Sequence, residues 1–167
     1  KELEKDQPKE RFTLGITDDV TFLSLPEVKP APITAAAGTK ECKFWGLGGD
    51  GTVGANKNSV KIIGDHTDKY VQAYFQYDSK KTGGVTISHL RFGDKPIRSP
   101  YYINQADFVA CHNPAYIHMG MKMVQDVKPG GVFMINCQWT DEELGQHLNA
   151  EAKKYIADNN IQLYTIN

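Results

Sequence analysis

A glycine-rich turn between an apolar strand and a helix start constrains this sequence most. An apolar run over residues 44–47 leads into four glycines within six positions, Gly46, Gly48, Gly49 and Gly51. Small and polar residues follow, and then an apolar-periodic run over residues 60–63. Glycines at such a turn let the backbone approach a ligand closely, and the helix N-terminus adds partial positive charge. The segment therefore predicts a site for a phosphate-bearing ligand, and its spacing matches the G-x-G-x-x-G fingerprint of dinucleotide-binding sites.

The charge balance and the hydropathy argue against two classes of function. Lys and Arg total 19 against 20 Asp and Glu, which gives a net charge of −1, so nothing points to nucleic acid. The sequence has no run of about 18 apolar residues, so we also expect no membrane association. A length of 167 residues with 40% hydrophobic content suits one domain with a substantial core.

The three cysteines, Cys42, Cys111 and Cys137, lie far apart in or near apolar runs. Because there is no C-x-x-C pair, we expect no iron–sulfur or zinc site of the usual spacing in this chain. Buried, reduced thiols indicate a reducing compartment, and we expect a cytoplasmic location. No signal peptide is visible, and the first residue is Lys rather than Met, which indicates a processed protein or a piece of a longer one.

The chain is predicted to have two parts. Residues 1–39 form a lead-in and a linker, because the first residues are charged and Pro30 and Pro32 obstruct regular structure. One short strand is expected within residues 12–25. Residues 40–167 form the domain proper.

Strands and helices alternate along this domain. We expect strands over residues 41–47, 70–77, 85–92, 106–111, 132–137 and 161–166, and helices over residues 56–64, 116–127 and 141–159. Residues 128–131 are expected to end the second helix, and Thr140 with Glu143 predicts a capping box for the third. The pattern is typical of an α/β fold, a Rossmann-like sheet with flanking helices, preceded by an extended N-terminal segment.

Several interpretations compete for the glycine turn. A nicotinamide or flavin dinucleotide requires an acidic residue about 20 positions on, at the end of the second strand. Asp78 follows that strand but lies farther along than the fingerprint requires. Lys80 and Lys81 come shortly after it, and they either suit a ribose phosphate or are a solvated pair at the end of the strand. Thiamine diphosphate fits Gly49-Asp50-Gly51, yet its later Asn-Asn pair is missing. A phosphate-rich carrier such as coenzyme A fits the turn and the lysines, and tight packing without a ligand is the remaining interpretation.

Candidate catalytic residues are few. The five histidines are scattered, none belongs to a motif such as H-E-x-x-H, and no Gly-x-Ser-x-Gly motif occurs. His89 and Arg91 lie two positions apart in an expected strand and so share a face. They either meet an anion or lie on the sheet surface, and we favour the surface. We therefore assign no catalytic residue.

Several segments resemble the pyruvate:ferredoxin (or flavodoxin) oxidoreductases, in the part similar to the gamma subunit of multi-subunit 2-oxoacid oxidoreductases. The resemblance rests on residues 15–21, 41–59 and 77–93, with shorter matches at residues 96–100, 106–111 and 128–136. These matches occur in order over much of residues 15–136, which is far more specific than one glycine motif.

The resemblance implies that this gamma-like domain binds coenzyme A within a very long enzyme. Such enzymes convert pyruvate, coenzyme A and an oxidised carrier into acetyl-CoA, carbon dioxide and reduced ferredoxin or flavodoxin. It also implies a homodimeric parent, with thiamine diphosphate and [4Fe-4S] clusters in other domains of the same chain. The residues that the resemblance assigns to coenzyme A are Gly49, Asp50, Gly51, Thr52, Val53, Lys80 and Lys81.

The family's matching region continues past Asn167, so we expect a domain truncated at its C-terminal end, an incomplete coenzyme A site and an isolated chain that is inactive. Two alternatives stay open. One is a self-sufficient NADP-dependent reductase, which rests on the glycine spacing and the two lysines. The other is a non-catalytic docking module that contacts neighbouring domains.

Overall fold

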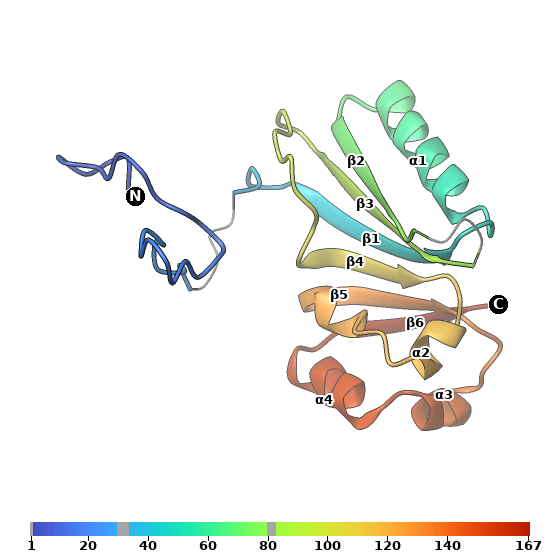
Figure 1. Ribbon diagram of the computed structural model, residues 1–167. Helices are drawn as coiled ribbons and strands as arrows, with labels where there is room; N and C mark the ends of the chain where they lie inside the picture. The colour runs from blue at the N-terminus through green and yellow to red at the C-terminus, as the bar shows by residue number, and fades with distance from the viewer. Residues whose placement is uncertain (1, 30–33, 80–82) are drawn as a thin grey trace. The chain divides into compact units, whose positions relative to one another are not determined.

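The structure, a computed structural model, describes residues 2–29, 34–79 and 83–167. The chain divides into two units, residues 1–34 and residues 35–167, and every helix and strand of the described residues belongs to the second unit (Figure 1). Within the described ranges, none of the helices combines the length and the apolar composition that crossing a bilayer requires.

The prediction of a short strand within residues 12–25 is wrong. Thr13 and Ser24 form only an isolated bridge, and their hydroxyl oxygens lie 2.9 Å apart. Between them, the Asp18 carboxylate accepts the N–H groups of Val20 and Thr21. Phe22 has a φ of 57°. A turn bonded to a side chain and a left-handed residue both interrupt the extended backbone that a strand needs.

In the described part of the chain, six strands form one mixed sheet in the order β2-β3-β1-β4-β5-β6 (Figure 1). The strands are β1 (Lys40–Leu47), β2 (Tyr70–Tyr77), β3 (Val85–Gly93), β4 (Ala106–Cys111), β5 (Val127–Asn136) and β6 (Gln162–Ile166). β4 pairs parallel with β1 and β5, and β5 pairs parallel with β6. The predicted Rossmann-like sheet is confirmed, with one difference. β3 lies between β1 and β2 and runs antiparallel to both. In a uniformly parallel Rossmann sheet, β1 and β2 would instead be direct neighbours.

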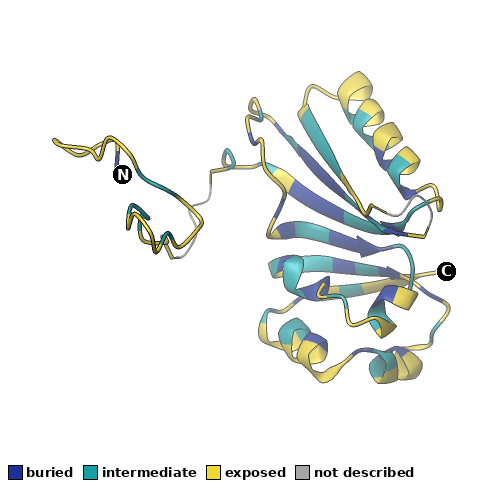
Figure 2. Ribbon diagram, in the orientation of Figure 1, coloured by how far each residue is buried: buried dark blue, intermediate teal, exposed yellow. Residues whose placement is uncertain are grey.

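Helices cover the two halves of the sheet from opposite faces. α1 (Thr52–His66) lies along β1, β2 and β3, and Gly46 of β1 faces its first residue. α2 (Ala115–His118), α3 (Asp141–His147) and α4 (Ala150–Asp158) lie along the β4–β6 half (Figure 1). Trp45 and Leu47, on the other face of β1, pack against the core that these helices share with β4 and β5. Figure 2 shows the buried residues concentrated in the central strands.

The helices differ from expectation in three places. α1 begins at Thr52 rather than at residue 56. Residues 116–127 hold only the single turn of α2 and a 3-10 turn, Val124–Asp126. Residues 141–159 form two helices, because Leu148 has a β-region backbone and Asn149 starts α4 by accepting the Ala152 N–H at 2.7 Å. The capping box of Thr140 and Glu143 is confirmed at the start of α3.

Residues 128–131 do not end a helix, as the sequence predicts, but lie inside β5. Gly130 has a φ of 75°, and the pairing with β4 shifts its register beside this segment. A Cβ on Gly131 would lie 2.9 Å from the carbonyl oxygen of Asp107. The Pro-Gly-Gly sequence therefore supplies a bulge that a strand of ordinary residues could not form.

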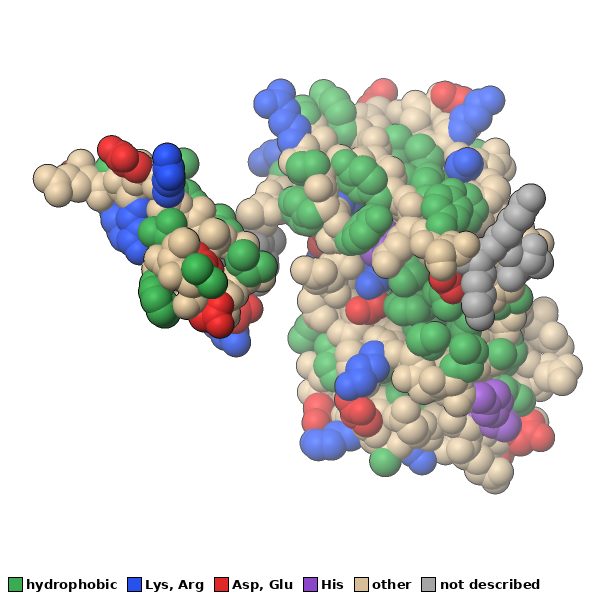
Figure 3. Space-filling model, viewed as in Figure 1, with side chains coloured by type: hydrophobic (Ala, Val, Ile, Leu, Met, Phe, Trp, Pro, Cys, Tyr) green, Lys and Arg blue, Asp and Glu red, His purple; other side chains and the backbone are tan. Residues whose placement is uncertain are grey.

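His89 and Arg91 are buried, 2% and 1% exposed, so the interpretation that they lie on the sheet surface is wrong. Arg91 Nε donates to Glu41 at 2.9 Å, and Arg91 Nη1 donates to the carbonyl oxygen of Tyr101 at 2.8 Å. Lys128 Nζ reaches the other oxygen of Glu41, also at 2.9 Å. The segment between β3 and β4 covers this face, and Figure 3 shows hydrophobic side chains gathered over it.

Adding a methyl group at Gly46 should destabilise the domain. A Cβ there would lie 2.5 Å from Thr52 Cβ, so the start of α1 must move away from β1. We expect Gly46→Ala to lower the free energy of unfolding in urea by about 1–3 kcal/mol. Gly54→Ala on the same helix is the matched control, because a Cβ at Gly54 has no atom within 4 Å. That control should be neutral or stabilising by up to about 1 kcal/mol. Equal effects of the two substitutions would contradict the prediction.

Acid should destabilise the domain through His89. Its ring stacks on Tyr102 at 4.7 Å, and its Nδ1 accepts the Ile103 N–H at 3.1 Å. Burial, and then the charges of Lys43 and Arg91, lower the pKa of His89 to about 4. The unfolded chain binds this proton near pH 6.5 and the folded chain only near pH 4, so stability is lost as the pH falls through this range.

We expect this group to remove about 2 kcal/mol of unfolding free energy between pH 7 and pH 5. In His89→Asn, the Oδ1 of the new side chain can accept the same N–H. Urea denaturation should show that the unfolding free energy of this variant falls between pH 7 and pH 5 by about 2 kcal/mol less than that of the natural sequence. Identical pH profiles for the variant and the natural sequence would show that His89 does not carry the effect.

Candidate functional site

A pocket of about 560 Å³ opens at the carboxyl ends of the parallel strands. Its lining comes from the carboxyl ends of four strands: Asp50, Gly51, Thr52 and Ala55 after β1, His112 after β4, Met134 and Asn136 at the end of β5, and Ile166 and Asn167 at the end of β6. The chain leaves β1 and β4 toward opposite faces of the sheet. Such a reversal creates a crevice outside the strand ends, and that crevice is where open α/β sheets bind ligands.

The four glycines of the turn have two separate functions. Gly46 and Gly48 permit close packing, because a Cβ would lie 2.5 Å from Thr52 Cβ at the first position and 3.3 Å from the Gly84 oxygen at the second. Gly49 and Gly51 have φ values of 97° and 89°, which favour glycine, and open space surrounds both. Packing therefore explains two of the glycines, and the backbone path of the turn explains the other two.

The Asp50 carboxylate orders this turn. One oxygen accepts the Leu47 N–H at 2.7 Å, and the other accepts the Thr52 N–H at 2.8 Å. Burial disfavours the charge of Asp50, but these bonds, a bond from the Thr52 side chain and the nearby His112 together hold its pKa below the usual range. Asp50 is therefore an anion that stabilises the turn.

Several N–H groups of the turn and the helix start are left for a ligand. Among the described residues, no partner accepts the N–H groups of Gly49, Gly51, Val53 and Gly54. The last two belong to the first turn of α1, where N–H groups have no partner inside the helix. The structure thus offers donors and the positive end of a helix dipole, which suit an anion.

His112 is a residue of the pocket that sequence reasoning missed. Its N–H donates to the carbonyl oxygen of Trp45 at 2.8 Å, and its own carbonyl accepts Asn136 Nδ2 at 3.2 Å. Its Nδ1 lies 3.0 Å from Thr52 Oγ1. Burial lowers the pKa of His112, and the charge of Asp50 acts in the opposite direction. The available signal was its position directly after a central parallel strand, where binding residues collect.

The structure brings together only part of the predicted site. Asp50, Gly51 and Thr52 line the pocket, whereas Gly49 and Val53 belong to the same turn and helix start without lining it. Lys80 and Lys81 lie outside the described residues. Their described neighbours contact the turn, since Gly48 donates to Gly84 at 2.7 Å and accepts from Gly83 at 3.2 Å.

The geometry of the described residues offers little to a metal or an iron–sulfur cluster. In those ranges no three His, Cys, Asp or Glu side chains gather in a way that could hold a metal ion. Burial raises the pKa of Cys42 and of Cys111 to about 12. Both thiols are therefore neutral at physiological pH in this fold.

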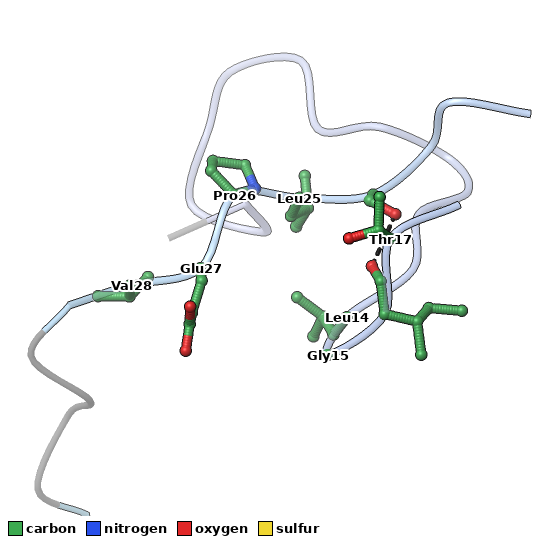
Figure 4. Close-up of a pocket in the computed structure, with 9 residues that line it drawn as sticks. Leu14, Gly15, Thr17, Leu25, Pro26, Glu27 and Val28 are labelled. Carbon is green, nitrogen blue, oxygen red and sulfur yellow. Dashed lines mark hydrogen bonds between the residues drawn. The ribbon is translucent and has the colours of Figure 1, made fainter. Parts of the chain in front are cut away.

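A second pocket, of about 710 Å³, lies within residues 14–28 of the first unit (Figure 4). Exposed apolar side chains such as Leu14 and Ile16 form much of its wall. Glu27 is the charged residue among those that line it, and Lys29, which is not part of the lining, pairs with its carboxylate at 3.0 Å. The lining itself thus contributes a negative charge, which disfavours a phosphate, and we place the candidate site in the second unit.

Comparison with known proteins identifies the family of this chain. The family model described as pyruvate ferredoxin/flavodoxin oxidoreductase matches residues 41–167. The chain is 54% identical over 165 residues to the pyruvate-flavodoxin oxidoreductase of Klebsiella pneumoniae, which covers 99% of this chain and 14% of that protein. It is 58% identical over 159 residues to the pyruvate:ferredoxin oxidoreductase of Moorella thermoacetica, which covers 95% of this chain and 13% of that protein. The chain thus spans about one seventh of the length of these relatives.

Two solved structures share the fold. A pyruvate oxidoreductase subunit from Thermotoga maritima superposes with a TM-score of 0.54 at 20% identity, covering 66% of this chain and 57% of its own. The gamma subunit of a keto/oxoacid ferredoxin oxidoreductase from Geobacter sulfurreducens gives 0.52 at 20% identity, covering 77% of this chain and 61% of its own. Because the family match runs from the start of β1 through β6 and includes the whole pocket, the chain belongs to the pyruvate ferredoxin/flavodoxin oxidoreductase family.

Proposed function

We propose that this chain is the coenzyme A-binding part of a larger oxidoreductase. The whole enzyme would convert pyruvate and coenzyme A into acetyl-CoA and carbon dioxide while it reduces ferredoxin or flavodoxin. Thiamine diphosphate and [4Fe-4S] clusters would belong to other domains, as the family implies, and the sequence of this chain has no C-x-x-C pair. This assignment rests on the family, whose named members are enzymes of this activity and several times longer than this chain.

The observation that carries the coenzyme A proposal is the pocket beside the unpaired N–H groups of the turn. Coenzyme A has a diphosphate, which suits the N–H groups at Gly51, Val53 and Gly54. It also has apolar parts, which suit the Ala55, Met134 and Ile166 side of the pocket. The negative charge of Asp50 repels phosphate, so we assign Asp50 to supporting the turn and the N–H groups to holding the ligand.

The sheet order favours coenzyme A over a dinucleotide. In a dinucleotide-binding sheet, the residue that contacts the ribose ends a strand that lies directly beside β1. Here β3 lies between β1 and β2, so Asp78 follows a strand that is not a neighbour of β1. This chain's own residues then bind and orient the carrier, and the chemistry on pyruvate belongs to the rest of the enzyme.

Coenzyme A added to the isolated chain should shift amide NMR signals at the turn. We expect weak binding, with the largest changes at residues 49–54, whose N–H groups form the proposed phosphate position, and at Lys80 and Lys81, which the sequence assigns to coenzyme A. NADPH at the same concentrations is the control and should leave these signals unchanged. Shifts confined to other residues would contradict the site. Binding of NADPH alone would favour a reductase, and binding of neither nucleotide would favour a docking module.

Lys81 is predicted from the sequence to contact the 3′-phosphate of coenzyme A, which dephospho-coenzyme A lacks. Loss of one charge-assisted contact costs about 1.5–3 kcal/mol, so Lys81→Ala should weaken coenzyme A binding by roughly tenfold to a hundredfold. Affinity for dephospho-coenzyme A should hardly change. Lys61→Ala, at an exposed position of α1, is the matched control for lost charge. Equal weakening for both ligands would assign Lys81 another role and make Lys80 the better candidate.

A further inference from the structure

The strand β2 lies at the outer end of the sheet, and in the described part of the chain it pairs with β3 alone (Figure 1). Just past β2, the N–H of Asp78 donates to the carbonyl oxygen of Val85 at 3.1 Å. Bonding toward the neighbour alternates along an antiparallel pair, so the even-numbered residues of β2 bond to β3. The backbone N–H and C=O groups of the odd-numbered residues therefore point away from the sheet. These residues are Val71, Ala73, Phe75 and Tyr77.

This edge of β2 lacks the features that keep exposed sheet edges apart. Residues 70–77 contain no charged residue and no Pro. The pairing with β3 runs over all eight residues without a register shift, so no bulge turns the edge away. Tyr70 and Tyr77, at its two ends, are 49% and 59% exposed. Soluble proteins protect a free edge with charges, Pro or bulges, so a regular and uncharged edge indicates that another strand covers it.

The side chains of β2 lie on two faces of the sheet. Phe75 faces α1, because the centre of its ring lies 5.6 Å from Lys57 Nζ. Side chains alternate along a strand, so Gln72, Tyr74 and Gln76 lie on the opposite face. A strand that joins this edge must therefore present side chains that suit a helix-covered face and a face of two amides and a phenol.

A second copy of β2 fits this edge about a two-fold axis that passes beside Tyr74. In that antiparallel register, Ala73 lies opposite Phe75 of the second copy, and Val71 lies opposite Tyr77. All four are outward-pointing residues, so each of these pairs exchanges two backbone hydrogen bonds, roughly eight bonds over the whole interface. Moving the axis by one residue along the strand would leave some of these groups without a partner. The backbone of β2 is thus complementary to itself in one register.

The side chains of β2 suit the same register. Gln72 comes opposite Gln76 of the second copy, and Tyr74 comes opposite itself. Amide pairs and aromatic pairs across antiparallel strands are favourable, and no like charges meet because the strand has none. Side-chain pairing and backbone pairing therefore favour one arrangement of two copies.

We propose that β2 is a dimerisation edge, at which a second copy of this chain continues the sheet through an antiparallel pair of β2 strands. A second copy is favoured over an unrelated strand, since one pattern of residues supplies both sides of a two-fold interface. The interface is separate from coenzyme A binding, because the lining of the pocket includes no residue of β2. Both pockets of the dimer stay open to a ligand.

Charge variants of the two glutamines test the pairing. Sedimentation equilibrium of the unaltered chain should show a reversible dimer. Gln72→Glu with Gln76→Glu places two carboxylates opposite each other twice in each dimer and should weaken dimerisation by about tenfold. Gln72→Glu with Gln76→Lys is the matched control, because it places opposite charges there and should keep the dimer. Both variants accommodate Glu at position 72, where Arg91 Nη1 donates to Gln72 Oε1 at 3.4 Å.

Two results of this experiment would overturn the proposal. One is an unaltered chain that stays monomeric at about 0.1 mM. The other is a dimer that the two charge variants form equally well, which would place the contact on another surface, such as the edge at β6.

Disulfide cross-linking tests the register independently. Tyr74→Cys brings two thiols together beside the two-fold axis, where opposite Cα atoms lie about 4.5 Å apart, within the range of a disulfide. With diamide as the oxidant, this variant should form a covalent dimer. Gln76→Cys should not, because its two copies would lie roughly 13 Å apart. The three natural cysteines are buried and do not compete. Equal cross-linking of the two variants, or cross-linking of neither, would contradict the register.

Discussion

The close approach of Thr52 to Gly46 determines where the whole site lies. Because Gly46 has no Cβ, the first turn of α1 rests directly on β1. From that position the Thr52 N–H bonds to Asp50 on the turn, and Thr52 Oγ1 lies 3.0 Å from Nδ1 of His112, which follows β4. A side chain at position 46 would hold the helix away from the strand and separate these groups. The pocket is therefore a consequence of strand–helix packing rather than of an independent binding loop.

Much of the fold was predictable because apolar runs and turn residues are local signals. The strands β1, β2, β3 and β4 lie within one residue of the bounds that the sequence predicts for them. The antiparallel direction of β3 was missed, although its short connection to β2 leaves no room for the crossover that a parallel pair requires. The helix expected over residues 116–127 failed for another reason. Tyr116, Met123 and Val124 are apolar because they fill the core from an irregular segment, and their spacing imitates a helical face.

The candidate site divides in the same way. The turn of residues 48–51 was predictable, because its glycines are neighbours in the sequence and form a local signal. His112 lies 60 positions from Thr52, and Asn136 lies 24 positions from His112, so only the alignment of β1, β4 and β5 brings them together. Arg91 was misplaced on the surface for a related reason. Its partner Glu41 is 50 positions away, so no local sequence pattern indicates that the two residues form a buried ion pair.

The central place of β1 in the sheet has a consequence for synthesis. β1 is the first strand of its unit to leave the ribosome, but both of its neighbours, β3 and β4, are made later. The Glu41 N–H bonds to Asp107, which is synthesised 66 positions later. Until β3 and β4 have been made, both hydrogen-bonding edges of β1 stay unpaired. β2 and β3 can pair as a hairpin as soon as they emerge. The strand that leads into the glycine-rich turn is thus the segment of the growing domain most exposed to aggregation, and the one for which protection by a chaperone matters most.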